Sequence, residues 1–77
     1  MISQASADAT LALTVNGDAR AVAAGTTVGA LLAALSLDPR LVVVERNREI
    51  LRDRDALDRI VLDDGDVLEI VHFVGGG

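Results

Sequence analysis

The sequence contains no cysteine, lysine, tryptophan or tyrosine, and it has only one phenylalanine, one proline and one histidine. Without cysteine the chain can form neither a disulfide nor a thiolate metal site, and it has no thiolate nucleophile. Because Phe73 is the single aromatic residue, the core must be aliphatic. All seven basic residues are arginine, so the chain also offers no lysine amine for an isopeptide bond to itself.

Length and charge narrow the possible functions. Seventy-seven residues make one small domain, which buries only about 60% of the surface of its unfolded chain. The net charge of −5 argues against nucleic acid, whose phosphates need a basic surface, and favours a basic protein partner. Residues 1–10 lack the pattern of a signal peptide, and the longest near-apolar stretch, residues 28–37, is too short to span a membrane. We therefore expect a cytoplasmic protein that binds neither nucleic acid nor membrane.

The first part of the chain predicts a lead-in and then a hairpin. Residues 1–10 are small, polar and aperiodic, so we expect a disordered lead-in and a domain that spans residues 11–73. Residues 11–15 alternate as a half-buried strand does, and residues 18–23 predict a weaker edge strand. Asn16-Gly17 between them is typical of a type I′ turn, which needs positive φ at both central positions.

The middle of the chain predicts its one good helix. Apolar residues recur at i, i+3, i+4 and i+7, which is the spacing of one helical stripe: Val28, Leu31, Leu32 and Leu35. Thr26 or Thr27 can cap this helix, and Pro39 prevents its continuation beyond residues 36–38.

The remaining segments predict three more strands. Residues 41–46 are β-branched, residues 49–51 return after a turn at Asn47-Arg48, and residues 67–73 form the last strand. Residues 52–59 mix Asp and Arg, which predicts a solvated loop or one helical turn whose charge cancels locally. One helix can cover only one face of such a sheet. The fold class is therefore an α+β roll of four to five strands with the other sheet face exposed.

The chain continues from this strand into Val74-Gly75-Gly76-Gly77, which we expect to be a flexible tail (residues 74–77). Glycine has no Cβ, so the tail can extend through a slot too narrow for side chains. The simpler alternative is a frayed terminus. If another enzyme joins the Gly77 carboxylate to AMP with ATP, a sulfur nucleophile can displace the AMP and leave a thiocarboxylate. Such a carrier of sulfur needs no cysteine.

The other candidate groups are weak. His72 is the only histidine, and a nucleophilic site would also need a base and an orienting group. The acid pairs Asp63/Asp64 and Asp53/Asp55 lie in turn-like segments, and a hard-cation site needs several converging oxygens. Gly25-Thr26-Thr27 precedes the helix but lacks the lysine and the glycine spacing of a phosphate loop. We therefore expect a protein that is not an enzyme, with no catalytic residue, no metal and no bound cofactor.

The exposed sheet face is the expected docking surface. Glu69 is the residue of the last strand least suited to the core, so Val71 and Phe73 should share its exposed side. By the same argument, Val43 shares a face with Glu45. A register shifted by one residue, or a strand buried on both faces, would remove this surface. The expected partner-binding residues are Val43, Glu69, Val71, Phe73 and Val74.

Several stretches together resemble the ubiquitin-like β-grasp fold and, more narrowly, the sulfur carrier family of thiamine biosynthesis (ThiS). The resemblance spans residues 11–77, and its most specific part is Glu69-Ile70-Val71-His72-Phe73-Val74-Gly75-Gly76-Gly77. The other matching stretches are Leu13-Thr14-Val15-Asn16-Gly17, Ala24-Gly25-Thr26-Thr27-Val28, Val44-Glu45-Arg46-Asn47 and Asp64-Gly65-Asp66-Val67.

The resemblance implies a mixed sheet whose first and last strands are parallel neighbours, and Gly76-Gly77 as the diglycine of the family. It also implies that an E1-like adenylating enzyme activates Gly77 with ATP, that a persulfide donor such as a cysteine desulfurase supplies sulfur, and that thiazole synthase receives it. Three alternatives stay open. They are a carrier for molybdopterin synthesis, a ubiquitin-like protein modifier, and an interaction module with an inert tail.

Overall fold

The computed structural model describes residues 9–73 of the chain. Most of the expected lead-in and the whole of the expected tail, residues 74–77, therefore lie outside the described residues. The elements follow in this order, with η marking a 3₁₀ helix: β1 (Thr10–Val15), β2 (Asp18–Ala23), α1 (Val28–Ala34), η2 (Pro39–Leu41), β3 (Val42–Arg46), β4 (Glu49–Ile50), η3 (Arg54–Arg59) and β5 (Val67–His72).

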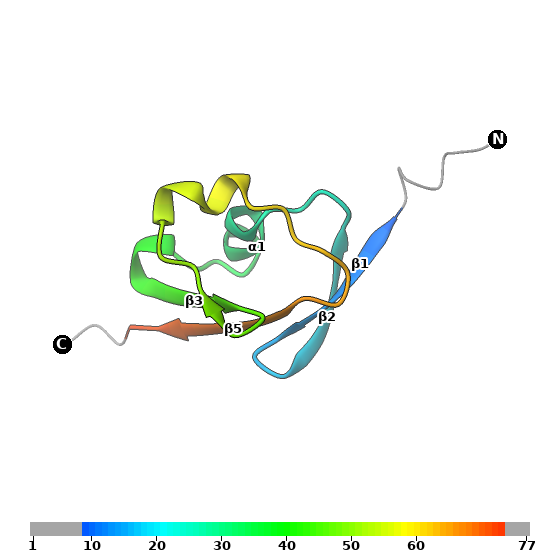
Figure 1. Cartoon of the computed structure of the whole chain (residues 1–77), viewed down its shortest axis with the longest axis horizontal. Helices are drawn as coiled ribbons and strands as arrows, with labels where there is room; N and C mark the ends of the chain where they lie inside the picture. Colours follow the sequence, from blue (N-terminus) through cyan, green and yellow to red (C-terminus); the bar gives the residue numbers. More distant parts are fainter. Residues whose placement is uncertain (1–8, 74–77) are drawn as a thin grey trace.

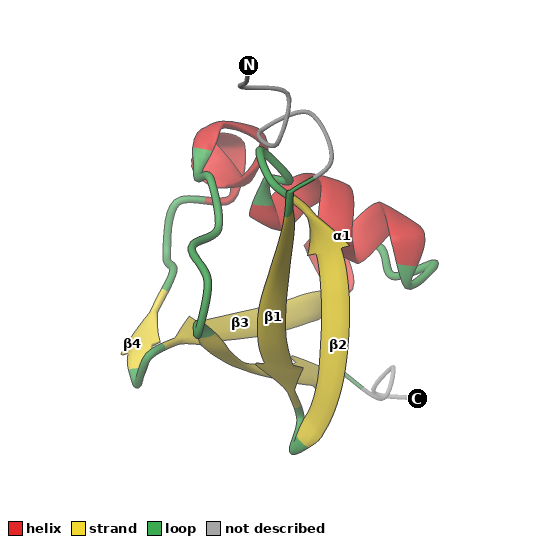
Figure 2. Ribbon diagram, turned by 90° about the vertical axis from the view of Figure 1, so that its right-hand side faces the viewer, coloured by secondary structure: helices red, strands yellow, loops and turns green. Residues whose placement is uncertain are grey.

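The strands form one mixed sheet in the order β2-β1-β5-β3-β4. β1 and β5 are parallel neighbours, with Thr14 opposite Val67, and the other neighbouring strands are antiparallel. α1 and η3 lie on the same side of the sheet, as Figure 1 shows. The β1–β2 hairpin is the long strand pair in the foreground of Figure 2. This is the β-grasp roll that the sequence predicts, with the last strand at the centre of the sheet.

Both hairpin turns begin with an asparagine. Asn16 and Gly17 have φ of +50° and +86°, as a type I′ turn requires, which confirms the predicted β1–β2 turn. Asn47 and Arg48 have φ of +51° and +73° between β3 and β4. Asparagine tolerates the left-handed region, whereas arginine is strained there. The conformation of the second turn is therefore stabilised by contacts with the rest of the fold as well as by the preference of Asn47 for the left-handed region.

The helix is shorter than its apolar stripe. Thr27 is the N-cap, and its Oγ1 accepts a hydrogen bond from the backbone N–H of Ala30 at 3.0 Å. Leu35, the last residue of the predicted stripe, is the C-cap, and Ser36 follows with φ of +60°. The predicted stop before Pro39 is thus confirmed.

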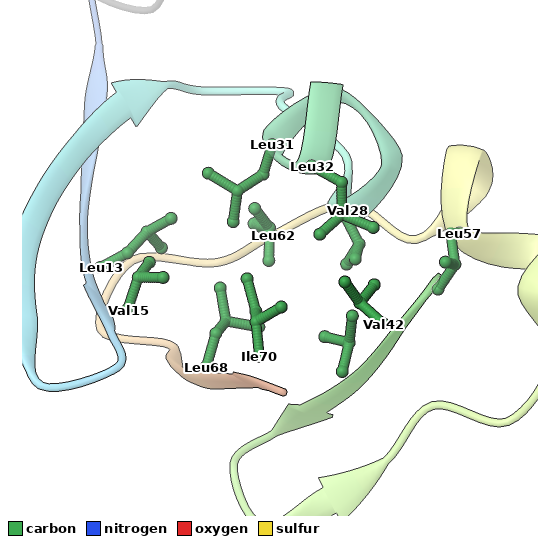
Figure 3. Packing of buried hydrophobic residues seen from close by; sticks show 11 residues of the cluster. Leu13, Val15, Val28, Leu31, Leu32, Val42, Leu57, Leu62, Leu68 and Ile70 are labelled. Atoms are coloured by element: carbon green, nitrogen blue, oxygen red, sulfur yellow. The ribbon is translucent and has the colours of Figure 1, made fainter. Parts of the chain in front are cut away.

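The core lies between α1 and the inner face of the sheet (Figure 3). Eleven buried aliphatic residues compose it: Leu13, Val15, Val28, Leu31, Leu32, Val42, Val44, Leu57, Leu62, Leu68 and Ile70. Residues 60–62 return to this core only in part. Val61 is 50% exposed, because it forms an isolated bridge with Thr27 and the alternation of extended backbone turns it outward between Ile60 and Leu62.

Residues 52 and 53 form a short loop that leads into η3, and η3 agrees with the expected helical turn. Asp53 caps η3 by accepting a hydrogen bond from the N–H of Asp55 at 3.0 Å. Leu57 is buried against the core. Gly29 of α1 allows this close approach, because a Cβ at that position would collide with the Asp58 carboxylate.

Candidate partner-binding site at the end of the last strand

From Val67 to Val71, the side chains of β5 alternate between an exposed and a buried face. Leu68 is fully buried and Ile70 is 8% exposed, and Figure 3 shows both pointing into the core. Glu69 is exposed, and Val71 and Phe73 are 60% and 45% exposed. The predicted register is therefore correct, and these three residues lie on the solvent side of the sheet. Their role in binding a partner remains a prediction.

β3 completes this outer face. Val43 lies directly opposite Val71, and Glu45 lies opposite Glu69, so each pair shares one side of the sheet. Val43 and Glu45 are half-buried. The expected placement of Val43 on the same face as Glu45 agrees with the structure, and the pairing of Val43 with Val71 joins the two strands into one continuous surface.

The hydrogen bonding continues past the end of β5. The N–H of Phe73 donates to the carbonyl of Leu41 at 2.8 Å, so Phe73 is held beside the start of β3. Leu41 is 45% exposed and extends the apolar surface. We call Leu41, Val43, Val71 and Phe73 the β3–β5 patch. The sequence argument did not include Leu41, because it placed residue 41 inside a strand and not at the 3₁₀ turn before it.

Two glutamates lie beside the patch. Glu45 and Glu69 face each other directly across β3 and β5. Like charges in this position disfavour strand pairing, so their presence is not explained by the stability of the sheet. An apolar patch with carboxylates on one side is a surface to which a protein with a complementary charge can dock. Val74, the fifth predicted partner-binding residue, lies outside the described residues, as do the predicted tail residues Gly75 and Gly76 and the predicted modification site Gly77.

The start of β5 is fixed by a polar network around Asp66, which is only 5% exposed. One carboxylate oxygen, Oδ2, accepts hydrogen bonds from Arg46 Nε at 2.9 Å and from the N–H of Asp63 at 2.8 Å. The other oxygen, Oδ1, accepts one from Asn47 Nδ2 at 3.0 Å. Burial opposes ionisation of Asp66, but these three donors outweigh it and hold its pKa below the ordinary value.

Two asparagine side chains add hydrogen bonds to the backbone of β5. Asn47 Oδ1 accepts from the N–H of Val67 at 2.9 Å, and Asn16 Oδ1 accepts from the N–H of Ile70 at 2.6 Å. Asn16 Nδ2 also donates to the carbonyl of Ile70 at 3.2 Å. The sequence marked both residues as turn formers but gave no sign that their amides pair with β5. Asp66 was missed for the same reason, because its partners are distant in the sequence.

The remaining candidates do not form a reactive site. His72 is exposed. Asp38 lies near it, but a hydrogen-bonded ion pair with Arg40 at 2.8 Å lowers the pKa of Asp38 to about 2, so that carboxylate is ionised at neutral pH. Within residues 9–73, no three acidic or histidine side chains are placed to hold a metal ion. The same residues include no helix long and apolar enough to cross a membrane.

The roll, the central last strand and the exposed patch at its end define a ubiquitin-like β-grasp protein. The ThiS family model matches residues 13–77, which is most of the chain. The chain therefore belongs to the ThiS family.

Individual relatives agree with this assignment. A protein of Bacillus subtilis named sulfur carrier protein ThiS is 49% identical over 51 residues, covering 66% of this chain and 76% of the relative. The crystal structure of a thiamine biosynthesis protein (ThiS) from Geobacter metallireducens has a TM-score of 0.72 at 41% identity. That match covers 87% of this chain and all of the other.

Two longer relatives carry a different name. A thiazole synthase of Paramagnetospirillum magneticum is 48% identical over 65 residues, which is 84% of this chain, and one of Magnetococcus marinus is 41% identical over 63 residues. The chain spans only 20% and 19% of the length of these two relatives. A ThiS-like sequence therefore occurs as a part of longer proteins named for thiazole synthesis.

Proposed function

We propose that the chain is a sulfur carrier that supplies a thiazole synthase during thiamine biosynthesis. The observation that carries this proposal is the ThiS family match, which runs through Gly77. Two features of the fold support it. The last strand is anchored at the centre of the sheet, and its exposed end lies beside an apolar patch where a partner can hold the carrier while the tail reacts.

The chemistry assigned to Gly77 can be written in balanced steps. An adenylating enzyme joins the Gly77 carboxylate to ATP, forming an acyl-adenylate and releasing pyrophosphate. The terminal sulfur of a persulfide then attacks the carbonyl carbon, AMP leaves, and an acyl disulfide to the sulfur donor forms. A thiol finally attacks the donor's sulfur, so that the S–S bond of the acyl disulfide breaks. A new disulfide forms between the thiol and the donor, and the thiocarboxylate stays on Gly77. Every reactive sulfur in these steps comes from other proteins, in keeping with a chain that has no cysteine.

The proposed acceptor is thiazole synthase. The names of the two longer relatives favour it over a molybdopterin synthase, because their ThiS-like part is joined to a protein named for thiazole formation. In this proposal the β3–β5 patch docks first on the adenylating enzyme and later on the synthase, and no cofactor stays bound to the carrier.

The test is the intact mass of the purified chain after incubation with ATP, the adenylating enzyme of its own host and a persulfide source. We expect a species in which one oxygen is replaced by sulfur, located in the C-terminal peptide. Transfer of that sulfur to thiazole synthase, and not to a molybdopterin synthase, would identify the acceptor. If only the carboxylate form is found with all three components present, the sulfur-carrier proposal fails. Covalent attachment to lysines of host proteins would instead favour the modifier alternative.

A further inference from the structure

A pocket lies along β3 on the edge that faces away from β5. β4 has only two residues and pairs with Glu45 and Arg46, so it ends before the first half of β3 (Figure 2). The chain then leaves the sheet toward η3. The gap is a pocket of about 190 Å³, which we call the β3-edge pocket. It is lined by Val42, Val43, Ile50, Leu51, Arg52 and Arg54.

The basic and acidic residues of segment 52–55 lie in different places relative to the pocket. Arg52 and Arg54 line the β3-edge pocket, whereas the two aspartates beside them do not. Asp53 is occupied as the N-cap of η3, where it accepts the N–H of Asp55. The sequence predicted that these charges cancel locally. Within this segment the lining of the pocket includes two arginines and no acidic residue.

The two arginines differ in how they are held. Arg54 Nη1 donates to the carbonyl of Arg40 at 3.1 Å, which ties it to the turn before β3 and leaves its other donors available. Arg52 is exposed, and within residues 9–73 its side chain makes no hydrogen bond or ion pair. Substitution of an exposed arginine without such a partner is expected to change the stability of the fold little.

The backbone of β3 adds a donor to the same pocket. The N–H of Leu51 donates to the carbonyl of Val44, so Val44 directs its backbone groups toward the β4 edge. Because this direction alternates along an antiparallel strand, Val42 presents its N–H and carbonyl to the same edge, where β4 has already ended. Val42 also lines the pocket. The edge of β3 that borders the pocket therefore carries a backbone N–H beside two arginines.

The β3-edge pocket is continuous with the β3–β5 patch, because Val43 belongs to both. The surface is therefore polarised. Glu45 and Glu69 lie across β3 and β5, and Arg52 and Arg54 lie beyond the free edge of β3. On a chain with a net charge of −5, this local basic edge is an exception. A partner that covers the patch meets opposite charges at two places, which fixes its orientation as well as its position.

We propose that the β3-edge pocket receives an acidic segment of thiazole synthase, with a carboxylate held by Arg52 and Arg54 while the synthase covers the β3–β5 patch. This inference rests on the proposed function and adds the charge and the place of one contact. Guanidinium groups recognise carboxylates with paired hydrogen bonds, and such contacts at the rim of an interface act mainly on the rate of association.

The experiment compares Arg52→Glu with Arg20→Glu. Both variants change the net charge equally, but Arg20 is exposed on β2, at the opposite edge of the sheet. Because the chain has no lysine, an amine-reactive dye labels the terminal amine alone. Stopped-flow fluorescence then measures association of each labelled carrier with purified thiazole synthase at low and high salt. Circular dichroism and thermal unfolding confirm that each variant is folded.

We expect Arg52→Glu to slow association about tenfold at low salt, and Arg20→Glu to slow it less than about twofold. The difference should fade near 1 M salt, where the screening length falls to about 3 Å. Equal slowing by Arg52→Glu and Arg20→Glu overturns the inference. The inference is also overturned if Arg52→Glu slows association with the adenylating enzyme but not with the synthase. It is equally overturned if Arg52→Glu changes only the association of the carrier with itself.

The proposed function is tested separately by sulfur loading of the unchanged chain. If the unchanged chain acquires sulfur and delivers it, but both charge variants associate equally fast, only the β3-edge contact is wrong. If the unchanged chain acquires no sulfur, the proposed function fails whatever the association rates are.

Discussion

The two ends of β5 are built in opposite ways. At its start, the buried Asp66 carboxylate and the Asn47 amide fix the strand through side-chain hydrogen bonds. At its end, Val71 and Phe73 are exposed, and one backbone hydrogen bond to Leu41 holds Phe73 in place. The same strand thus begins as an anchored core element and ends as an apolar surface. The buried side-chain network lies at the start of β5, and the predicted partner-binding surface lies at its end.

The largest effect should come from the inner face of β5. Leu68→Ala removes a fully buried side chain at the centre of the core, and we expect it to lower the free energy of unfolding by about 3 kcal/mol or more. Val71→Ala, three residues later on the exposed face, should cost less than about 1 kcal/mol. Urea unfolding followed by circular dichroism measures both. Similar losses for the two variants would mean that β5 does not divide into a structural and a binding face.

The second prediction concerns the tail beyond the exposed end. If the adenylating enzyme has a slot that excludes a Cβ, Gly77→Ala should slow sulfur loading about 100-fold, since a misplaced reacting group costs this much. Gly75→Ala adds the same methyl group farther from the reacting carbon and should slow loading less. Intact mass spectrometry follows loading over time, and thermal unfolding should give the same midpoint for both variants. Normal loading of Gly77→Ala would contradict the narrow slot.

The contribution of the Asp66 network at the start of β5 is tested by Asp66→Asn. This change keeps the shape of the side chain but removes the charge that accepts from Arg46 and Asp63, and we expect a loss of about 2 kcal/mol at pH 7. Asp64→Asn is the matched control in the same turn. The Asp64 carboxylate accepts one hydrogen bond, from the N–H of Ala12, at an exposed site, so that its loss should cost less.

The pH dependence of the Asp66 effect gives the sign of its contribution. The pKa of Asp66 is below its ordinary value in the folded protein, so its charge stabilises the fold above the pKa of the unfolded chain, about 3.9. This contribution is lost as the pH falls through the depressed folded pKa. Urea unfolding of the unchanged chain and of Asp66→Asn should therefore differ at pH 7 and converge in strong acid. A difference that stays constant down to the lowest pH would show that the charge is not the cause.

The sequence predicted those parts of the fold that depend on local patterns. Alternation located β1 and the exposed side of β5, the Asn16-Gly17 dipeptide located the first hairpin, and the leucine spacing located α1. It could not predict the anchor of β5, because Asp66 and its partner Arg46 are twenty residues apart and carry no shared pattern. The sorting of Arg52 and Arg54 away from their neighbouring aspartates likewise appears only when η3 forms and takes Asp53 as its cap.

The smallest expected change in free energy comes from a substitution at the exposed end of β5. Phe73→Glu replaces the one aromatic side chain of the β3–β5 patch with a charge, on the sheet face that already carries Glu69. We expect the dissociation constant for the adenylating enzyme to rise about tenfold, or about 1.4 kcal/mol, because an apolar contact is lost and a carboxylate is desolvated in the interface. Unfolding stability should change by less than about 0.5 kcal/mol, since Phe73 is already 45% exposed and its hydrogen bond to Leu41 uses only the backbone.

The control variant Phe73→Leu keeps an apolar side chain and should restore most of the affinity. If Phe73→Glu unfolds the protein instead, Phe73 belongs to the structural part of β5, and the boundary between anchored strand and binding surface lies beyond it.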